Sequence, residues 1–470
     1  MKFLPSLRSR LRSTSFILHT SRHPEPRLQA SWNCAQIGLF IFPLIPSLGG
    51  VGLGLALLTV WKQQYRTIMR RSLNWGLAIL IVWLIISSGF AFNRSEAFLG
   101  LANFLPFFLF FVAFSILIQT PAQLRQLAWI LVLPSVPMVI LGFGQLFWGW
   151  AGLVQLQPVL GWVLEAKGSP PGRMSSAFMY ANTLGAYLQI VFILGLGLWV
   201  EEAKKRLPLS LASPGDEAKG KKGNASFFPF RFTWRMSFLS FVVMGNAIAL
   251  ILTDSRNAWA ITVLSCLAFA LYLGWHWLLA VVAAVATSVL WAAFGPSPVQ
   301  QWLRAIVPAF FWARLTDQIY PDRPLATLRV TQWHFAWFMT QERPWTGWGL
   351  RNFTPLYEAH MHVWLGHPHN LFLMLSAETG IPATLLFCGL VGWVLAQGVL
   401  FVANGSSALP QDKLIFFSYL LAFGGCTVFN TVDVSLFDLR VNTLGWLLLS
   451  AIWGVVYKQR AIAIPRTYSN

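Results

Sequence analysis

The residues of this sequence that are best suited to chemistry are histidines and arginines. Four of the eight histidines, His360, His362, His367 and His369, lie within ten residues of one another. Histidine titrates near neutral pH and can act as a general base, and clustered histidines can also bind a metal ion. Their spacing lacks the i, i+4 pattern of catalytic zinc helices, and no cysteine accompanies them. We therefore expect one catalytic histidine and no metal; an ordinary histidine cluster at a membrane surface is the competing interpretation.

Three arginines stand in polar motifs at the edges of apolar runs. Arg173 lies in the motif 172–182, Arg256 lies in 253–259, and Arg329 precedes aromatic residues at helical spacing. A guanidinium group stays charged at any relevant pH and binds two oxygens at once, which suits a diphosphate. Simpler explanations exist, because charged residues at a membrane boundary can extend toward water and an aromatic helix can lie at the interface. The arginines and a histidine on one predicted face favour a site for a lipid-linked diphosphate.

The surroundings of these residues are those of a membrane protein. Of the 470 residues, 56% are hydrophobic and only 11% are charged, and the mean hydropathy is +0.59. This composition excludes a water-soluble globular protein. The formal net charge of +18 could suit nucleic acid, but the lysines and arginines gather in short segments between apolar runs, as they do on the cytoplasmic side of membrane proteins. We expect the bilayer, and no nucleic acid, as a partner.

The apolar runs give the fold class. A transmembrane helix needs roughly 20 apolar residues. The sequence contains twelve runs, the first two of them short, at residues 33–46, 48–61, 73–92, 98–118, 127–147, 174–200, 236–253, 258–275, 277–294, 372–401, 414–430 and 441–457. We predict an all-α, polytopic membrane protein with about twelve transmembrane helices, whose first two runs either cross the bilayer or form a hairpin within it.

The distribution of positive charge predicts the orientation. If residues 1–31 are cytoplasmic, most of the 34 lysines and arginines fall on the cytoplasmic side, with both chain ends. The predicted layout in the inner membrane is as follows: a basic N-terminus at 1–31, transmembrane helices at 32–200, a cytoplasmic linker at 201–235, a second transmembrane region at 236–457 and a cytoplasmic tail at 458–470. The second region includes an extracytoplasmic loop, 295–371, whose many tryptophans predict a folded cap at the membrane interface.

These motifs, in this order, resemble the O-antigen ligase and polymerase superfamily. The pieces that carry the resemblance are residues 173–182, Ser255-Arg256, Arg329 with the motif 343–349, and His369-Asn370-Leu371 with Glu378 and Gly380. The resemblance covers roughly residues 170–455 and is specific as an ordered set. It implies an O-antigen ligase-like region within 236–457, in which a large periplasmic loop precedes the catalytic histidine.

The resemblance also implies an activity. A glycan would pass from an undecaprenyl-diphosphate donor to a lipid or glycan acceptor at the periplasmic face, with inversion and without a cofactor. Arg256 and Arg329 would hold the diphosphate and stabilise the departing charge. Arg173 would be a further donor contact, and His369 would be the general base. His367 stands two residues before His369, so the motif leaves open which of them acts.

Two other functions compete with this one. Residues 431–433 and the segment to Trp446 resemble a cyanobacterial branch of the superfamily that has been labelled as a bicarbonate transporter. A transporter should carry charged or polar residues near the middle of the membrane, where this sequence has little besides Gln189 and Asn246. A non-catalytic scaffold of a glycan-export complex is the third interpretation.

Overall fold

The computed structural model describes residues 22–205, 233–316, 324–404 and 409–463. Most of the basic N-terminus, most of the predicted linker and the end of the predicted tail lie outside the described residues. Within them, every regular element is a helix, and there is no strand. An all-α fold is what a membrane chain requires, because a helix satisfies its own backbone hydrogen bonds where no water is present.

Ten stretches of the described chain are long and apolar enough to cross a membrane. They confirm the polytopic prediction and correspond to the last ten predicted runs. Single helices form eight of them: α4 (Ser72–Gly89), α10 (Ala181–Lys204), α11 (Trp234–Leu252), α12 (Arg256–Leu273), α13 (His276–Phe294), α18 (Leu371–Asn404), α19 (Pro410–Phe429) and α20 (Leu439–Ala463). Two broken helices form the others: α5 (Arg94–Gly100) with α6 (Leu105–Leu117), and α7 (Pro121–Val132) with α8 (Ser135–Phe147).

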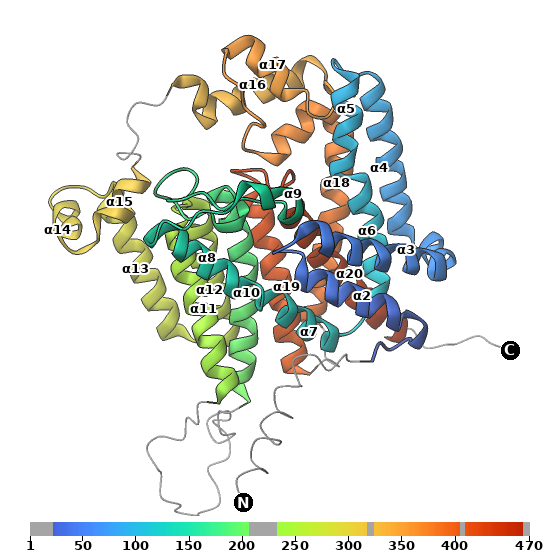
Figure 1. Ribbon diagram of the computed structural model, residues 1–470, viewed down its shortest axis with the longest axis horizontal. Coiled ribbons are helices and arrows are strands. Elements are labelled where there is room, and N and C mark those ends of the chain that lie inside the picture. The colour runs from blue at the N-terminus through green and yellow to red at the C-terminus, as the bar shows by residue number, and fades with distance from the viewer. Residues whose placement is uncertain (1–21, 206–232, 317–323, 405–408, 464–470) are drawn as a thin grey trace, which may run out of the picture.

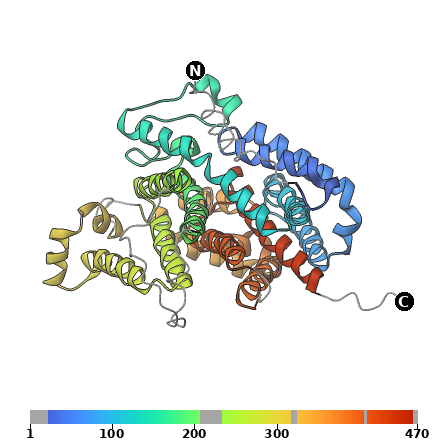
Figure 2. The same cartoon turned by 90° about the horizontal axis from the view of Figure 1, so that it is seen from below.

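The first two predicted runs are not among these ten stretches. They form α2 (Gln29–Ile41) and α3 (Pro46–Arg70), two helices that pack against each other and lie across the upright helices (Figures 1 and 2). With 13 residues, α2 is about 20 Å long, whereas the hydrocarbon core is about 30 Å thick. The pair therefore has the form of a hairpin, and the predicted number of twelve spans becomes ten.

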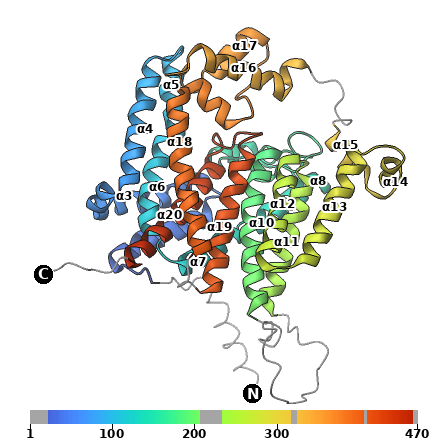
Figure 3. The same ribbon diagram turned by 180° about the vertical axis from the view of Figure 1, so that it is seen from behind.

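Two helices occupy the centre of the bundle. Most residues of α10 are buried, and α10 packs against α7, α11, α12 and α19. Similarly, α20 is buried against α6, α18 and α19. Both helices are mainly apolar, as expected for helices enclosed by others. By contrast, α13 is largely exposed and stands at the side of the bundle (Figure 3).

The described residues of the predicted loop 295–371 include four α-helices, joined by turns and irregular segments. These helices are α14 (Val299–Ile306), α15 (Ala309–Leu315), α16 (Arg329–Glu342) and α17 (Phe353–Met361). The last two helices form a cap at one end of the bundle, with a small core of their own around Phe335, Phe353 and Tyr357 (Figure 1). The cap lies at the end opposite to the end of α10 and the start of α11.

A kink in α18 attaches the cap to the bundle. Gly380 has a φ of +82°, and the motif 343–349 lies against it. Ile381 N–H donates to Pro344 O, and Gly349 N–H donates to Glu378 O. These bonds replace intrahelical ones that the kink breaks. The motif 343–349, together with Glu378 and Gly380, therefore joins the cap to a spanning helix and makes no direct contribution to the histidine site described below.

Candidate active site

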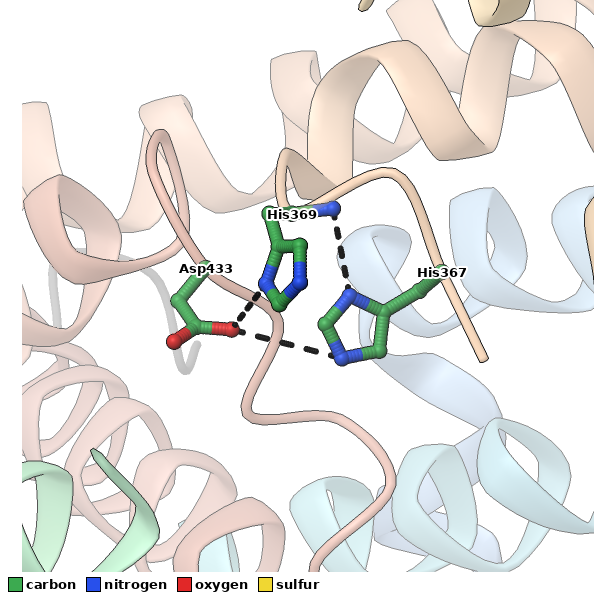
Figure 4. A group of neighbouring side chains, drawn as sticks. All are labelled: His367, His369 and Asp433. Carbon is green, nitrogen blue, oxygen red and sulfur yellow. Dashed lines mark hydrogen bonds and ion pairs between the residues drawn. The ribbon is translucent and has the colours of Figure 1, made fainter. Parts of the chain in front are cut away.

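His369 and Asp433 form a hydrogen-bonded pair at the capped end of the bundle. His369 precedes α18, Asp433 lies in the loop between α19 and α20, and Nδ1 of the histidine is 3.0 Å from Oδ1 of the carboxylate (Figure 4). Asn370 caps α18 by accepting from the N–H groups of Phe372 and Leu373. This cap fixes the start of the helix directly after His369.

The hydrogen bond to Asp433 assigns the roles of the two imidazole nitrogens. A carboxylate can only accept, so Nδ1 of His369 carries the proton that is shared with Oδ1. In the neutral imidazole, Nε2 of His369 is then the basic atom. The side chain is 22% exposed, which leaves it accessible to a substrate. His369 therefore has the arrangement of a general base that is oriented by a carboxylate.

His367 supports this pair and has a different environment. Its Nδ1 accepts a hydrogen bond of 3.1 Å from the backbone N–H of His369, and its Nε2 is 4.0 Å from Oδ1 of Asp433. The ring also stacks on Phe437. Burial and the neighbouring His369 lower the pKa of His367 to about 4, so it is neutral at physiological pH. These contacts favour His369 as the base and His367 as a residue that positions it.

Asp433 remains ionised although it is buried. Burial alone would raise its pKa, but the hydrogen bond from His369 and the two nearby imidazoles lower it to about 2. The backbone N–H of Val434 also donates to Oδ1. The sequence motif 431–433 indicated only a branch of a family, and the pairing of Asp433 with a histidine 64 residues earlier was not predicted.

His367, His369 and Asp433 are close enough together to be considered as metal ligands. A neutral histidine that binds a metal through one nitrogen normally donates a hydrogen bond from the other. In His367, Nδ1 accepts a hydrogen bond, which places the proton on Nε2, the nitrogen that faces Asp433. The three groups therefore fit a hydrogen-bonded acid–base cluster better than a metal site.

Asn182 connects this cluster to Arg173. Its amide Nδ2 donates to Oδ2 of Asp433 at 2.8 Å, and its Oδ1 accepts from Nη2 of Arg173 at 2.6 Å. Arg173 also donates from Nε to Thr253 O, and its side chain is buried. Arg173 and Asn182 flank the start of α10, and both were named in the motif 172–182. Hydrogen bonds through the amide of Asn182 and the carboxylate of Asp433 thus connect Arg173, a predicted donor contact, with His369, the predicted base.

Arg314 is a further arginine that the sequence did not indicate. It lies in α15 and forms an ion pair of 2.9 Å with Asp254, the middle one of the three residues between α11 and α12. Both side chains are buried. Burial raises the pKa of Asp254, and the charges of Arg314, Arg173 and Arg256 oppose this rise. Three arginines are therefore close to one carboxylate at the start of α12.

Arg256 and Arg329 are the first residues of α12 and α16. Arg329 is close enough to Tyr180 to affect its pKa. Partial burial and Asp433 raise the pKa of Tyr180, whereas Arg173, Arg329 and Arg314 lower it. Arg329 also lowers the pKa of His367, so it lies near the histidine cluster.

These arginines form an electropositive region beside the His369–Asp433 pair. The helices α10, α12 and α18 begin at this end of the bundle, and a helix N-terminus carries a partial positive charge. Four arginines from separate elements add to it: Arg173, Arg256, Arg314 and Arg329. Such a region is suited to a diphosphate, whose oxygens guanidinium groups and helix N-termini bind.

The family comparison agrees with this geometry. Residues 239–388 match the family model described as O-antigen ligase. The match runs from α11 to α18 and contains Arg256, Arg329 and His369, whereas Arg173 and Asp433 lie outside it. No curated protein matches the chain. The segment 239–388, about a third of the chain, is therefore similar to the O-antigen ligase family, in agreement with the resemblance of its motifs.

Proposed function

We propose that this protein is a metal-independent, inverting glycosyltransferase of the O-antigen ligase type. It moves a glycan from an undecaprenyl-diphosphate donor to a hydroxyl group of a lipid or glycan acceptor, at the periplasmic face of the inner membrane. The observation that carries the proposal is the chain of contacts from His369 through Asp433 and Asn182 to Arg173. It supports the proposal because hydrogen bonds connect a histidine that a carboxylate orients with a buried arginine.

Each residue of the candidate site has its own role in the proposed reaction. Nε2 of His369 takes the proton of the acceptor hydroxyl as its oxygen bonds to the anomeric carbon. The bond from that carbon to the diphosphate breaks at the same time, and the electron pair leaves with the phosphate oxygen. Arg173, Arg256 and Arg329 stabilise the negative charge that develops there. Asp433 keeps the proton on Nδ1 and stabilises the imidazolium that forms.

Transfer by the purified protein tests this proposal directly. The native chain is reconstituted with an undecaprenyl-diphosphate-linked glycan and a panel of acceptors. We expect His369→Gln and Arg329→Ala each to lower the transfer rate by about 10³-fold or more, because they remove the base and a charge-stabilising group. The control is His360→Gln, which changes an exposed histidine of the cap and should retain the native rate.

Two results would count against the proposal. Transfer that persists in His369→Gln would remove the histidine from the chemistry. Failure with every acceptor, together with bicarbonate uptake in proteoliposomes that neither substitution affects, would replace the glycosyltransferase by a transporter.

A further inference from the structure

An apolar cavity of about 200 Å³ lies between α18, α19 and α20. Its walls include Phe387 and Val391 from α18, Phe423 from α19, and Trp446 and Leu449 from α20. All five residues belong to candidate membrane spans. In other proteins a cavity of roughly 150 Å³ holds a molecule the size of benzene, so this one can hold a segment of several carbon atoms.

The cavity reaches the outer surface of the bundle along α18. Gly392 lines it and is exposed, and a Cβ atom added at Gly392 would meet no atom within 4 Å. The same holds for the space around Gly445 on α20. A hydrocarbon chain in the bilayer can therefore enter from the side without displacing a helix.

One end of the cavity adjoins the His369–Asp433 pair. Leu371 and Phe372 line it two and three residues after His369, and Asn430 and Ser435 line it on either side of Asp433. Asn430 accepts hydrogen bonds from Ser435 and belongs to the same loop as the carboxylate. The polar end of an apolar cavity thus lies next to the proposed base.

Two of the four arginines, Arg173 and Arg256, lie away from this cavity. Arg173 and Arg256 come from the segments that begin α10 and α12, and neither helix contributes a residue to the cavity. Asp433 separates the two regions, since Oδ1 faces His369 and Oδ2 faces Asn182 on α10. The diphosphate region and the cavity therefore lie on opposite sides of the His369–Asp433 pair.

This arrangement identifies the occupant. In an inverting displacement the incoming oxygen and the leaving phosphate lie on opposite faces of the anomeric carbon. If the arginines hold the diphosphate, the acceptor must approach from the side of His369, where the cavity ends. We propose that the cavity binds the hydrocarbon chain of a lipid acceptor, whose reacting hydroxyl lies close to its membrane anchor. This inference rests on the proposed function and narrows its acceptor to a lipid.

Binding of a single-chain glycolipid tests the cavity without any transfer reaction. The full-length protein is placed in phosphatidylcholine nanodiscs, so that no solubilising detergent competes with the probe for the cavity. The probe is dodecyl glucoside with a diazirine near the end of its chain, and the labelled peptides are identified after irradiation. Gly392→Trp fills the cavity, and Gly389→Trp is the matched control. Gly389 is three residues away on α18, is exposed, has open space around it and does not line the cavity.

We expect the probe to label segments of α18, α19 and α20 that line the cavity. Labelling in Gly392→Trp should fall about tenfold, which corresponds to about 1.4 kcal/mol of binding, while Gly389→Trp stays at the native level. Unlabelled dodecyl glucoside should compete and methyl glucoside should not, because the chain provides the affinity.

Three outcomes would overturn the inference. Equal labelling in both glycine variants would show that the probe samples only the lipid-facing surface. Competition by undecaprenyl diphosphate, with none by dodecyl glucoside, would assign the cavity to the donor. Loss of labelling by any phospholipid of similar chain length would reduce it to a site for bulk lipid. The labelling measurements do not depend on catalysis. A negative labelling result can therefore be distinguished from a failure of the proposed transfer reaction.

Discussion

Both carboxylate oxygens of Asp433 accept hydrogen bonds. Oδ1 accepts from Nδ1 of His369 and from Val434 N–H, and Oδ2 accepts from Asn182. Since each bond holds the carboxylate in one orientation, the imidazole of His369 is held as well. The positive φ of His369, +52°, shows that the backbone there adopts a conformation that residues with a side chain rarely use. The surrounding contacts must stabilise this conformation, as they often do at functional sites.

Asp433→Asn tests the orienting role. An amide can donate a hydrogen bond to Nδ1, which would move the imidazole proton to Nε2 and remove the base. We expect kcat for glycan transfer to fall by about 10²- to 10⁴-fold, with KM for the donor changed little. Initial rates at varied donor concentration measure both quantities.

Glu358→Gln is the matched control for this substitution, because Glu358 is an exposed carboxylate of the cap. If Asp433→Asn kept a kcat close to that of the control, His369 would not depend on this carboxylate for its tautomer.

At the scale of elements, the kink of α18 determines where the cap lies. The helix cannot continue regularly through Gly380, and the freed backbone groups pair with the motif 343–349. Ser87 of α4 adds a hydrogen bond of 2.6 Å to Thr346 O, and Phe92 N–H donates to Trp348 O. These contacts fix the segment that follows α16, the helix that begins with Arg329. Correct placement of one arginine thus depends on a glycine in a spanning helix.

Gly380→Ala should destabilise the protein. A Cβ atom at this position would lie 2.1 Å from Trp345 O, and its φ of +82° is unfavourable for alanine. We expect a loss of about 2 to 4 kcal/mol of stability. In thermal unfolding of the purified protein, this should lower the midpoint by about 2 to 4 °C.

Gly389→Ala is the comparison, because this glycine lies in the same helix with open space around it. Alanine should leave the midpoint unchanged or raise it slightly, since it favours helix more than glycine does. A midpoint for Gly380→Ala as high as that of Gly389→Ala would show that the kink adapts to a side chain.

At the scale of the whole molecule, the two ends of the bundle carry different sets of charged side chains. The capped end carries the arginines and the His369–Asp433 pair. At the other end, Arg125 of α7 bridges Glu201 of α10 and Asp412 of α19, with N–O distances of 2.7 Å. This bridge ties three helices together where α10 ends. The polar side chains of the candidate site thus gather at one end, as an enzyme acting at a membrane surface requires.

Labelling of single introduced cysteines tests the predicted orientation. Leu325 of the cap region and Trp234 at the start of α11 are both highly exposed, at 77% and 80%. If the capped end faces the periplasm, a membrane-impermeant maleimide should label Leu325→Cys in intact spheroplasts, and Trp234→Cys only after permeabilisation. The unmodified chain is the control, because its four cysteines lie in helices. The reverse pattern would place the candidate site on the cytoplasmic side.

The sequence by itself determined that most of this protein lies in lipid and that its secondary structure is helical. Apolar runs of about 20 residues must form helices in lipid, and ten of the twelve predicted runs became candidate spans. The first two runs differ because α2 is too short to cross and pairs with α3 instead. Local motifs also marked Arg173, Arg256, Arg329 and His369, since charged residues at the ends of apolar runs stand out.

Only the tertiary structure decided which of these residues meet. Asn182 and Asp433 are 251 residues apart, and Arg314 and Asp254 are separated by 60. Helical periodicity reports which face of a helix is apolar, but it carries no information about which distant loop packs against that face. The choice of His369 over His367 likewise depended on the position of Asp433 and on a backbone hydrogen bond. These are properties of packing between segments, and they arise only when the whole bundle has assembled.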